Sequence, residues 1–237
     1  MTFVKRCFHI LPQSLLFKKI KMEKQFKKAS GISLLTGAVL ATITMAMHPV
    51  GGSLEEIANR KVVFIFTHSL ALISIPFIAF GFWGLATALV TKSRVSFLAF
   101  AVSCFALVAV MAAGTLNGFV LPMFASNYAG STVDGDVLQA VRDYGWLLGS
   151  SMDYIFITGL SLAMARWSGI MIATGQLSKW LGYYGFLIAV VTVIGLLMKF
   201  NFTTDVGFGA FIFTLVSWLI CAALLLIFSS KNIQTHD

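Results

Sequence analysis

The sequence predicts an all-α, polytopic membrane protein built as a bundle of six transmembrane helices. Two observations on composition support this fold class. Of the 237 residues, 58% are hydrophobic and only 11% are charged, and the mean hydropathy is +0.89. Soluble domains carry about 25% charged residues. This composition excludes an ordinary soluble enzyme, a disordered chain and a nucleic-acid-binding domain, because so much apolar surface cannot be buried in a core of this size.

The third observation is the length of the apolar runs. Six runs approach or exceed the roughly 20 residues that a helix needs to cross a bilayer. They are continuous rather than alternating, which excludes the strands of a membrane barrel. None contains Lys, Arg or Glu, and only one contains Asp. The runs are 31–48, 62–90, 95–125, 144–165, 181–198 and 208–228.

The chain outside these runs predicts tails and short loops. Residues 1–30 form a basic N-terminal tail and residues 229–237 a C-terminal tail, flanking a transmembrane domain of residues 31–228. Part of the N-terminal tail is either an amphipathic helix on anionic lipid or the product of a misassigned start, with Met22 as the alternative. From Val137 the apolar pattern predicts a short amphipathic lead-in to the fourth span.

Basic residues predict the orientation. If the chain changes sides of the membrane at each span, 13 Lys and Arg residues lie on one side. The other side has four Lys and Arg residues and six acidic residues. Because cytoplasmic loops are rich in Lys and Arg, we expect both termini in the cytoplasm and the protein in a bacterial plasma (inner) membrane. The net charge of +8 then reflects topology, and no nucleic-acid partner is expected. The 13 are Lys5, Arg6, Lys18, Lys19, Lys21, Lys24, Lys27, Lys28, Lys92, Arg94, Arg166, Lys179 and Lys231.

Small residues at four-residue spacing predict where helices approach closely. Gly114 and Gly118 lie on one face of the third span, and Gly145 and Gly149 on one face of the fourth. Such faces let helix backbones meet in lipid, although glycine is also generally common in membrane helices.

A few polar residues lie within or at the ends of the spans. At about 1.5 Å per residue, His48, His68 and Asn117 lie near the outer boundary, and Asp153 lies nearer the middle of the membrane. Ionisable residues inside a span are functional candidates because burying them is costly. With Tyr154, these four residues predict a polar pocket that opens outward.

Four functions fit these residues. In the first, the protein has a structural or accessory role beside a membrane partner, and Asp153 pairs with Arg142 or a hydroxyl such as Ser150 to fix the fourth helix. In the second, Asp153, Asn117, His68 and Tyr154 bind a substrate or pass protons in a small transporter, with a homodimer supplying further helices.

The third and fourth functions need a cofactor. His48 and His68 could bind a single b-type haem between the first two helices. The same histidines, with Asp153, Glu55 or Glu56, could bind zinc in a membrane hydrolase. No metal-ligand spacing and no catalytic motif supports an enzyme. The expected partners are the lipid bilayer and either a second copy of the chain or a membrane partner protein.

Overall fold

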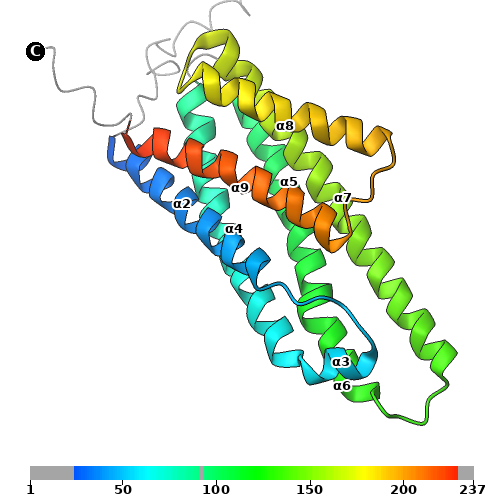
Figure 1. Ribbon diagram of the computed structural model, residues 1–237. Coiled ribbons are helices and arrows are strands. Elements are labelled where there is room, and N and C mark those ends of the chain that lie inside the picture. The colour runs from blue at the N-terminus through cyan, green and yellow to red at the C-terminus, as the bar shows by residue number, and fades with distance from the viewer. Residues whose placement is uncertain (1–23, 91–92, 229–237) are drawn as a thin grey trace, which may run out of the picture.

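The computed structural model describes residues 24–90 and 93–228, and this part of the chain is all-α. Six of its helices are long and apolar enough to cross a membrane, so the predicted fold class of a six-helix bundle is confirmed. The chain is therefore a multi-pass membrane protein. The six are α2 (Lys24–Ala46), α4 (Lys61–Val90), α5 (Val95–Thr115) with its continuation, α7 (Gly135–Thr174), α8 (Lys179–Leu197) and α9 (Asp205–Phe228) (Figure 1).

The fourth span differs most from its predicted bounds. The expected lead-in and span form one uninterrupted helix, α7, of 40 residues, which is about 60 Å long and twice as long as the hydrocarbon core is thick. No proline interrupts residues 135–174. The Asp134 carboxylate accepts the backbone N–H of Asp136 at the start of the helix, and Gly175 ends it in the left-handed conformation (φ 70°), as glycine commonly does.

The predicted tails lie mainly outside the described residues. The proposed amphipathic segment before Met22 and residues 229–237 belong to that part of the chain. The last residues of the predicted N-terminal tail, from Lys24, are helical and continue directly into the first span as α2.

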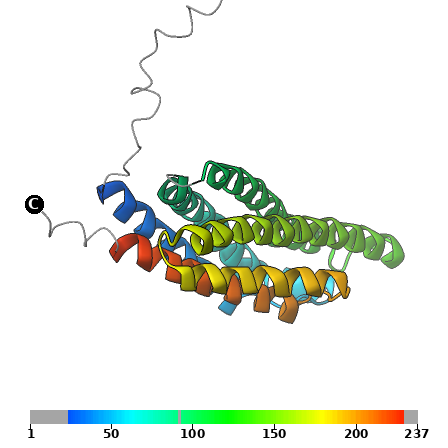
Figure 2. The ribbon, with the colours of Figure 1, turned by 90° about the horizontal axis from the view of Figure 1, so that it is seen from above.

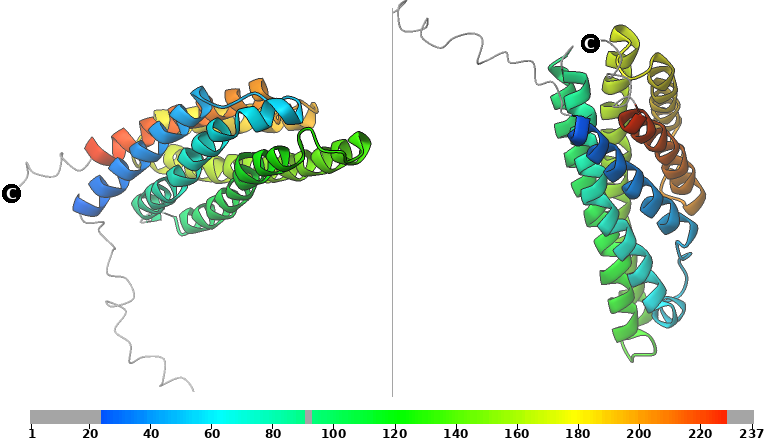
Figure 3. Two further views of the ribbon diagram at one scale, coloured as in Figure 1. Left: turned by 90° about the horizontal axis from the view of Figure 1, so that it is seen from below. Right: turned by 90° about the vertical axis from the view of Figure 1, so that its left-hand side faces the viewer.

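The long helices form a ring in which most neighbours follow one another along the chain. Helix α2 packs on α4, α4 on α5, α5 on α7 and α7 on α8, while α9 returns to α2 and also touches α8 (Figures 1 and 2). The start of α2 and the end of α9 lie at the same end of the bundle (Figure 3). We call the half of the bundle at this end the closed half and the opposite half the cavity half.

Close helix contacts fill the closed half. A Cβ atom on Gly31 of α2 would lie 2.9 Å from the carbonyl oxygen of Ala223 in α9, and Gly84 of α4 lies directly against the side chain of Ser30. The indole N–H of Trp167 donates to the carbonyl and hydroxyl oxygens of Ser96, at 3.2 Å each. These contacts leave little free space where the basic ends of the helices meet.

The cavity half is less regular. The third span continues beyond α5 as a π-helical segment (Leu116–Val120) and then as α6 (Leu121–Tyr128). Pro122 stands at the beginning of α6, where its missing N–H is tolerated. Across from α6, the connection between α2 and α4 contains a short helix, α3 (Leu54–Asn59), which begins with a reciprocal cap between Ser53 and Glu56.

Candidate functional site

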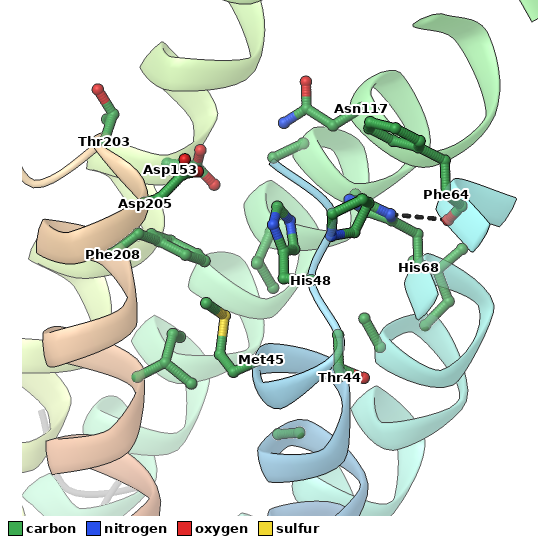
Figure 4. Close-up of a pocket in the computed structure, with 18 of the residues that line it drawn as sticks. Thr44, Met45, His48, Phe64, His68, Asn117, Asp153, Thr203, Asp205 and Phe208 are labelled. Carbon is green, nitrogen blue, oxygen red and sulfur yellow. Dashed lines mark hydrogen bonds between the residues drawn. The ribbon is translucent and has the colours of Figure 1, made fainter. Parts of the chain in front are cut away.

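A cavity of about 240 Å³ lies in the cavity half, enclosed by α2, α4, the third span, α7 and α9 (Figure 4). It brings together four of the five predicted pocket residues, which come from four different helical spans or their ends. Its ionisable, amide, hydroxyl and indole side chains are His48, His68, Asn117, Asp153, Asp205, Thr44, Ser74, Ser150, Thr203, Thr204 and Trp146.

Two histidines form one side of this cavity. His68 is buried in α4, and its Nδ1–H donates to the carbonyl oxygen of Phe64 at 2.9 Å. Because that oxygen can only accept, the other ring nitrogen of a neutral His68, Nε2, carries a lone pair. His48 follows the end of α2, and its ring centre lies 5.1 Å from that of His68. Burial lowers the pKa of His48 below 6.5, and the nearby Asp205 partly opposes this.

Two carboxylates line the cavity away from the histidine pair (Figure 4). Asp153 is half-buried on α7, and Asp205 is the first residue of α9, where the helix dipole favours a negative charge. Thr204 caps this helix by accepting the N–H of Gly207 at 3.0 Å. Within the described residues, neither carboxylate has a hydrogen-bond or ion-pair partner.

Arg142 does not pair with Asp153, contrary to one interpretation of the sequence. Its Nε lies 3.7 Å from a carboxylate oxygen of the adjacent Asp143, and its Nη1 contacts the carbonyl oxygen of Gly52 at 3.4 Å. Arg142 lies about three helical turns from Asp153 along α7, on the part of the helix beyond the cavity. Arg142 therefore gives Asp153 no ion pair.

The glycines and Asn117 have different surroundings. Gly118 lies directly against the side chain of His68, and a Cβ on Gly149 would lie 3.1 Å from Oδ1 of Asn117. Gly114 lines the cavity with an ordinary contact to Leu72, at 3.7 Å. Gly145 faces open space, with no atom within 4 Å of its Cβ position. Gly114 and Gly118 of the third span therefore face α4, whereas Gly149 of the fourth span faces Asn117 of the third.

Tyr154 is the predicted pocket residue that the cavity leaves out. It is half-buried and packs against the main hydrophobic core, because its position next to Asp153 turns it by about 100° around the helix.

Sequence reasoning missed Asp205, Thr203, Thr204 and Trp146 as lining residues. The sequence pattern indicated only that Asp205 is an acidic residue in a loop between two spans. An available signal was its position directly before the last apolar run, at the predicted level of His48 and His68. An acidic residue at a helix start is common, so this signal alone did not single it out.

The described residues do not fit the two cofactors that the histidines suggested. Their His, Cys, Asp and Glu side chains contain no group of three placed to hold one metal ion. For haem, the cavity volume of about 240 Å³ lies below the roughly 300–1,000 Å³ of pockets that hold drug-sized ligands. Two imidazoles on opposite sides of one metal at about 2 Å, the arrangement that a haem iron needs, hold their ring centres about 6 Å apart, whereas these lie 5.1 Å apart.

Comparison of the chain with protein families, with curated proteins and with solved structures finds no match in any of the three.

Proposed function

We propose that this membrane protein binds a small cation in the cavity and acts as a carrier, with the cavity facing outward. The observation that carries this proposal is a set of hydrogen-bond acceptors around one space that have no donor among residues 24–90 and 93–228. Ionised Asp153 and Asp205 only accept hydrogen bonds, and Nε2 of neutral His68 also accepts. A ligand that satisfies them must be rich in donors, as ammonium and guanidinium groups are.

The size of the cavity limits the ligand. Pockets for drug-sized molecules have volumes of about 300–1,000 Å³, and this cavity has about 240 Å³. It lies beside helices that are interrupted or begin at its rim, namely the π-helical segment and the start of α9. Transporters bind substrates at such helix interruptions. Both features support a small solute as the ligand.

The outward orientation rests on charge. The described Lys and Arg residues at the end of the closed half are Lys24, Lys27, Lys28, Arg94, Arg166 and Lys179. The acidic residues Glu55, Glu56, Asp134, Asp136 and Asp143 lie at the end of the cavity half, with Arg60, Lys61, Arg142 and Lys199. By the positive-inside rule, the closed half faces the cytoplasm of a plasma membrane.

Cysteine labelling in intact cells tests this orientation. In a background with Cys7, Cys104 and Cys221 changed to Ser, we expect a membrane-impermeant maleimide to label Ser150→Cys, which lines the cavity. The matched Thr174→Cys, exposed at the other end of α7, should label only after permeabilisation. The reverse pattern contradicts the orientation, and failure to label Ser150→Cys under both conditions contradicts a water-filled cavity.

Binding of methylguanidinium, a permanently charged cation, tests the function. The protein in lipid nanodiscs is titrated while tryptophan emission is followed, because Trp146 lines the cavity. We expect saturable binding that Asp153→Asn and Asp205→Asn each weaken about tenfold or more, since each removes a charge-assisted bond. The control Asp143→Asn, an exposed carboxylate outside the cavity, leaves the affinity unchanged.

Counterflow of methylguanidinium in proteoliposomes tests the carrier step. Exchange should be present in the wild type and absent in Asp153→Asn. If no saturable binding occurs, or if neither Asp→Asn change weakens it, the proposed function is wrong and a structural or accessory role gives the better account. Binding without any exchange contradicts the carrier step and keeps the binding site.

A further inference from the structure

The cavity changes from polar to apolar with depth. On α4, Ile75 and Ile78 follow His68 by seven and ten residues, so they lie about 10 and 15 Å further into the bundle at about 1.5 Å per residue. Ile212 of α9 follows Asp205 by seven residues, and Leu107 of α5 precedes Asn117 by ten. Three helices thus place an apolar base at a similar depth below the polar groups.

A second hollow, of about 330 Å³, lies between α2 and α9 and adjoins the cavity. The two spaces share Met45, His48 and Asp205. The outer wall of this hollow includes Val206, which is 82% exposed, and Phe213, both placed to face lipid. The space beside His48 and Asp205 is therefore accessible from the side of the bundle, between α2 and α9, as well as from the end of the bundle.

The contacts between α2 and α9 loosen toward this hollow. In the closed half, a Cβ on Gly31 would come within 2.9 Å of the backbone of α9. Near the hollow, a Cβ on Gly209 would meet only the terminal methyl group of Met45, at 3.6 Å. Methionine is unbranched and flexible, so at this point a movable side chain separates the hollow from the cavity.

We propose, on the basis of the function proposed above, that the ligand is a single-chain amphiphilic cation that reaches the cavity from the bilayer between α2 and α9. Its cationic head binds Asp153 and Asp205, and its short alkyl chain occupies the apolar base. A cation without a chain leaves the base unfilled, and a lipid with two long chains exceeds the volume of about 240 Å³.

Affinity as a function of chain length tests the ligand class. In nanodiscs, n-hexylguanidinium should bind more tightly than methylguanidinium, by about fourfold for each methylene that the base buries. Val110→Phe narrows the base, since Val110 is a half-buried lining residue. This change should remove most of the advantage of the hexyl chain, measured as the ratio of the affinities for the two cations. Ile75→Phe, on another helix, provides a second test.

The matched control is Val108→Phe on the same helix. Val108 is 57% exposed and does not line the cavity, so this variant should retain the full chain-length preference. The wild type could bind the two cations with equal affinity, or neither Val110→Phe nor Ile75→Phe could reduce its preference for the hexyl chain. Either result overturns the proposal that the ligand is amphiphilic, and leaves the proposed cation site intact. Failure of both cations to bind in a carboxylate-dependent way instead overturns the proposed function itself.

Association kinetics test the route between α2 and α9. Ala210→Phe fills the second hollow and should slow the binding of n-hexylguanidinium, measured by stopped-flow tryptophan fluorescence, at least tenfold. Methylguanidinium, which partitions poorly into lipid, should bind at the wild-type rate. The control Val193→Phe lies on an exposed face of α8 and should affect neither rate. An unchanged hexylguanidinium rate in Ala210→Phe overturns access from the bilayer.

Discussion

The two halves of this bundle use the same helices in different ways. In the closed half, α2 meets α4 and α9 through glycines whose Cβ positions lie within 3 Å of neighbouring atoms, and buried indoles bond across helices. In the cavity half, the same α2 ends and leaves a cavity of about 240 Å³ edged by carboxylates that have no partner in the part of the chain that the structure describes. In lipid, apolar burial gives no force for helix association, so helices are held together by close packing. Close packing in the closed half therefore permits an open site in the cavity half.

The largest effect should come from breaking a glycine contact in the closed half. Gly31→Leu places a side chain against the backbone of Ala223, which cannot move away, and overpacking typically costs about 1–3 kcal/mol or more. We expect loss of the monodisperse folded protein in size-exclusion chromatography. Gly145→Leu, at a position with open space, should behave as the wild type. A folded, stable Gly31→Leu protein contradicts the contrast between the halves.

A tryptophan pair provides the next largest contrast. Trp167→Phe removes the N–H that bonds Ser96 of α5 and leaves the buried oxygens short of a donor, which costs about 1–3 kcal/mol. Trp146→Phe changes a residue that is 52% exposed, and it should change stability by less than about 0.5 kcal/mol. Thermal unfolding in detergent measures both. Similar melting temperatures for the two variants would contradict the assignment of the stabilising bond to the closed half.

The pH dependence of stability should come from the cavity half. Burial holds the pKa of His48 below its ordinary value of 6.5, so between these two values the unfolded chain binds more protons than the folded protein. Stability is then fully present above pH 6.5 and falls as the pH is lowered toward the pKa of the folded state.

Replacing His48 isolates its share of this dependence. In His48→Gln, the melting temperature should decrease less between pH 7.5 and pH 5 than it does in the wild type. Outside this pH range, the melting temperatures of the two proteins should depend on pH in the same way. The informative measurement is the difference between the two curves, because the remaining titratable groups are common to both proteins. Parallel curves for the variant and the wild type would rule out a contribution of His48.

The smallest expected effect distinguishes two buried serines. The Ser161 hydroxyl oxygen is buried without a partner among the described residues, whereas the Ser103 hydroxyl donates to the carbonyl oxygen of Phe100 at 2.7 Å. Ser161→Ala should be neutral or stabilising by up to about 1 kcal/mol, and Ser103→Ala destabilising by about 0.5–1.5 kcal/mol. Chemical denaturation of the two variants compares them. A clear loss of stability in Ser161→Ala would show that its hydroxyl is bonded.

The sequence by itself determined the class of this protein and the heights of its polar residues. Continuous apolar runs predict spans because every backbone group in lipid must be bonded within its own helix. A rise of about 1.5 Å per residue then places His48, His68 and Asn117 at one level, and the structure has all three on one cavity together with Asp153. The role of these residues stays a prediction that the binding measurements address.

Only the tertiary structure decided which helices share that level and what lies between them. Asp205 reaches the cavity because α9 packs on α2 and begins beside His48, and Tyr154 misses it because its side chain points into the core. The gap beside Gly209 also follows from packing. The apolar runs determine which residues form each span, and therefore how deep each residue lies in the membrane. Which helices are neighbours, and how each helix is rotated about its axis, depends on contacts between residues far apart in the chain.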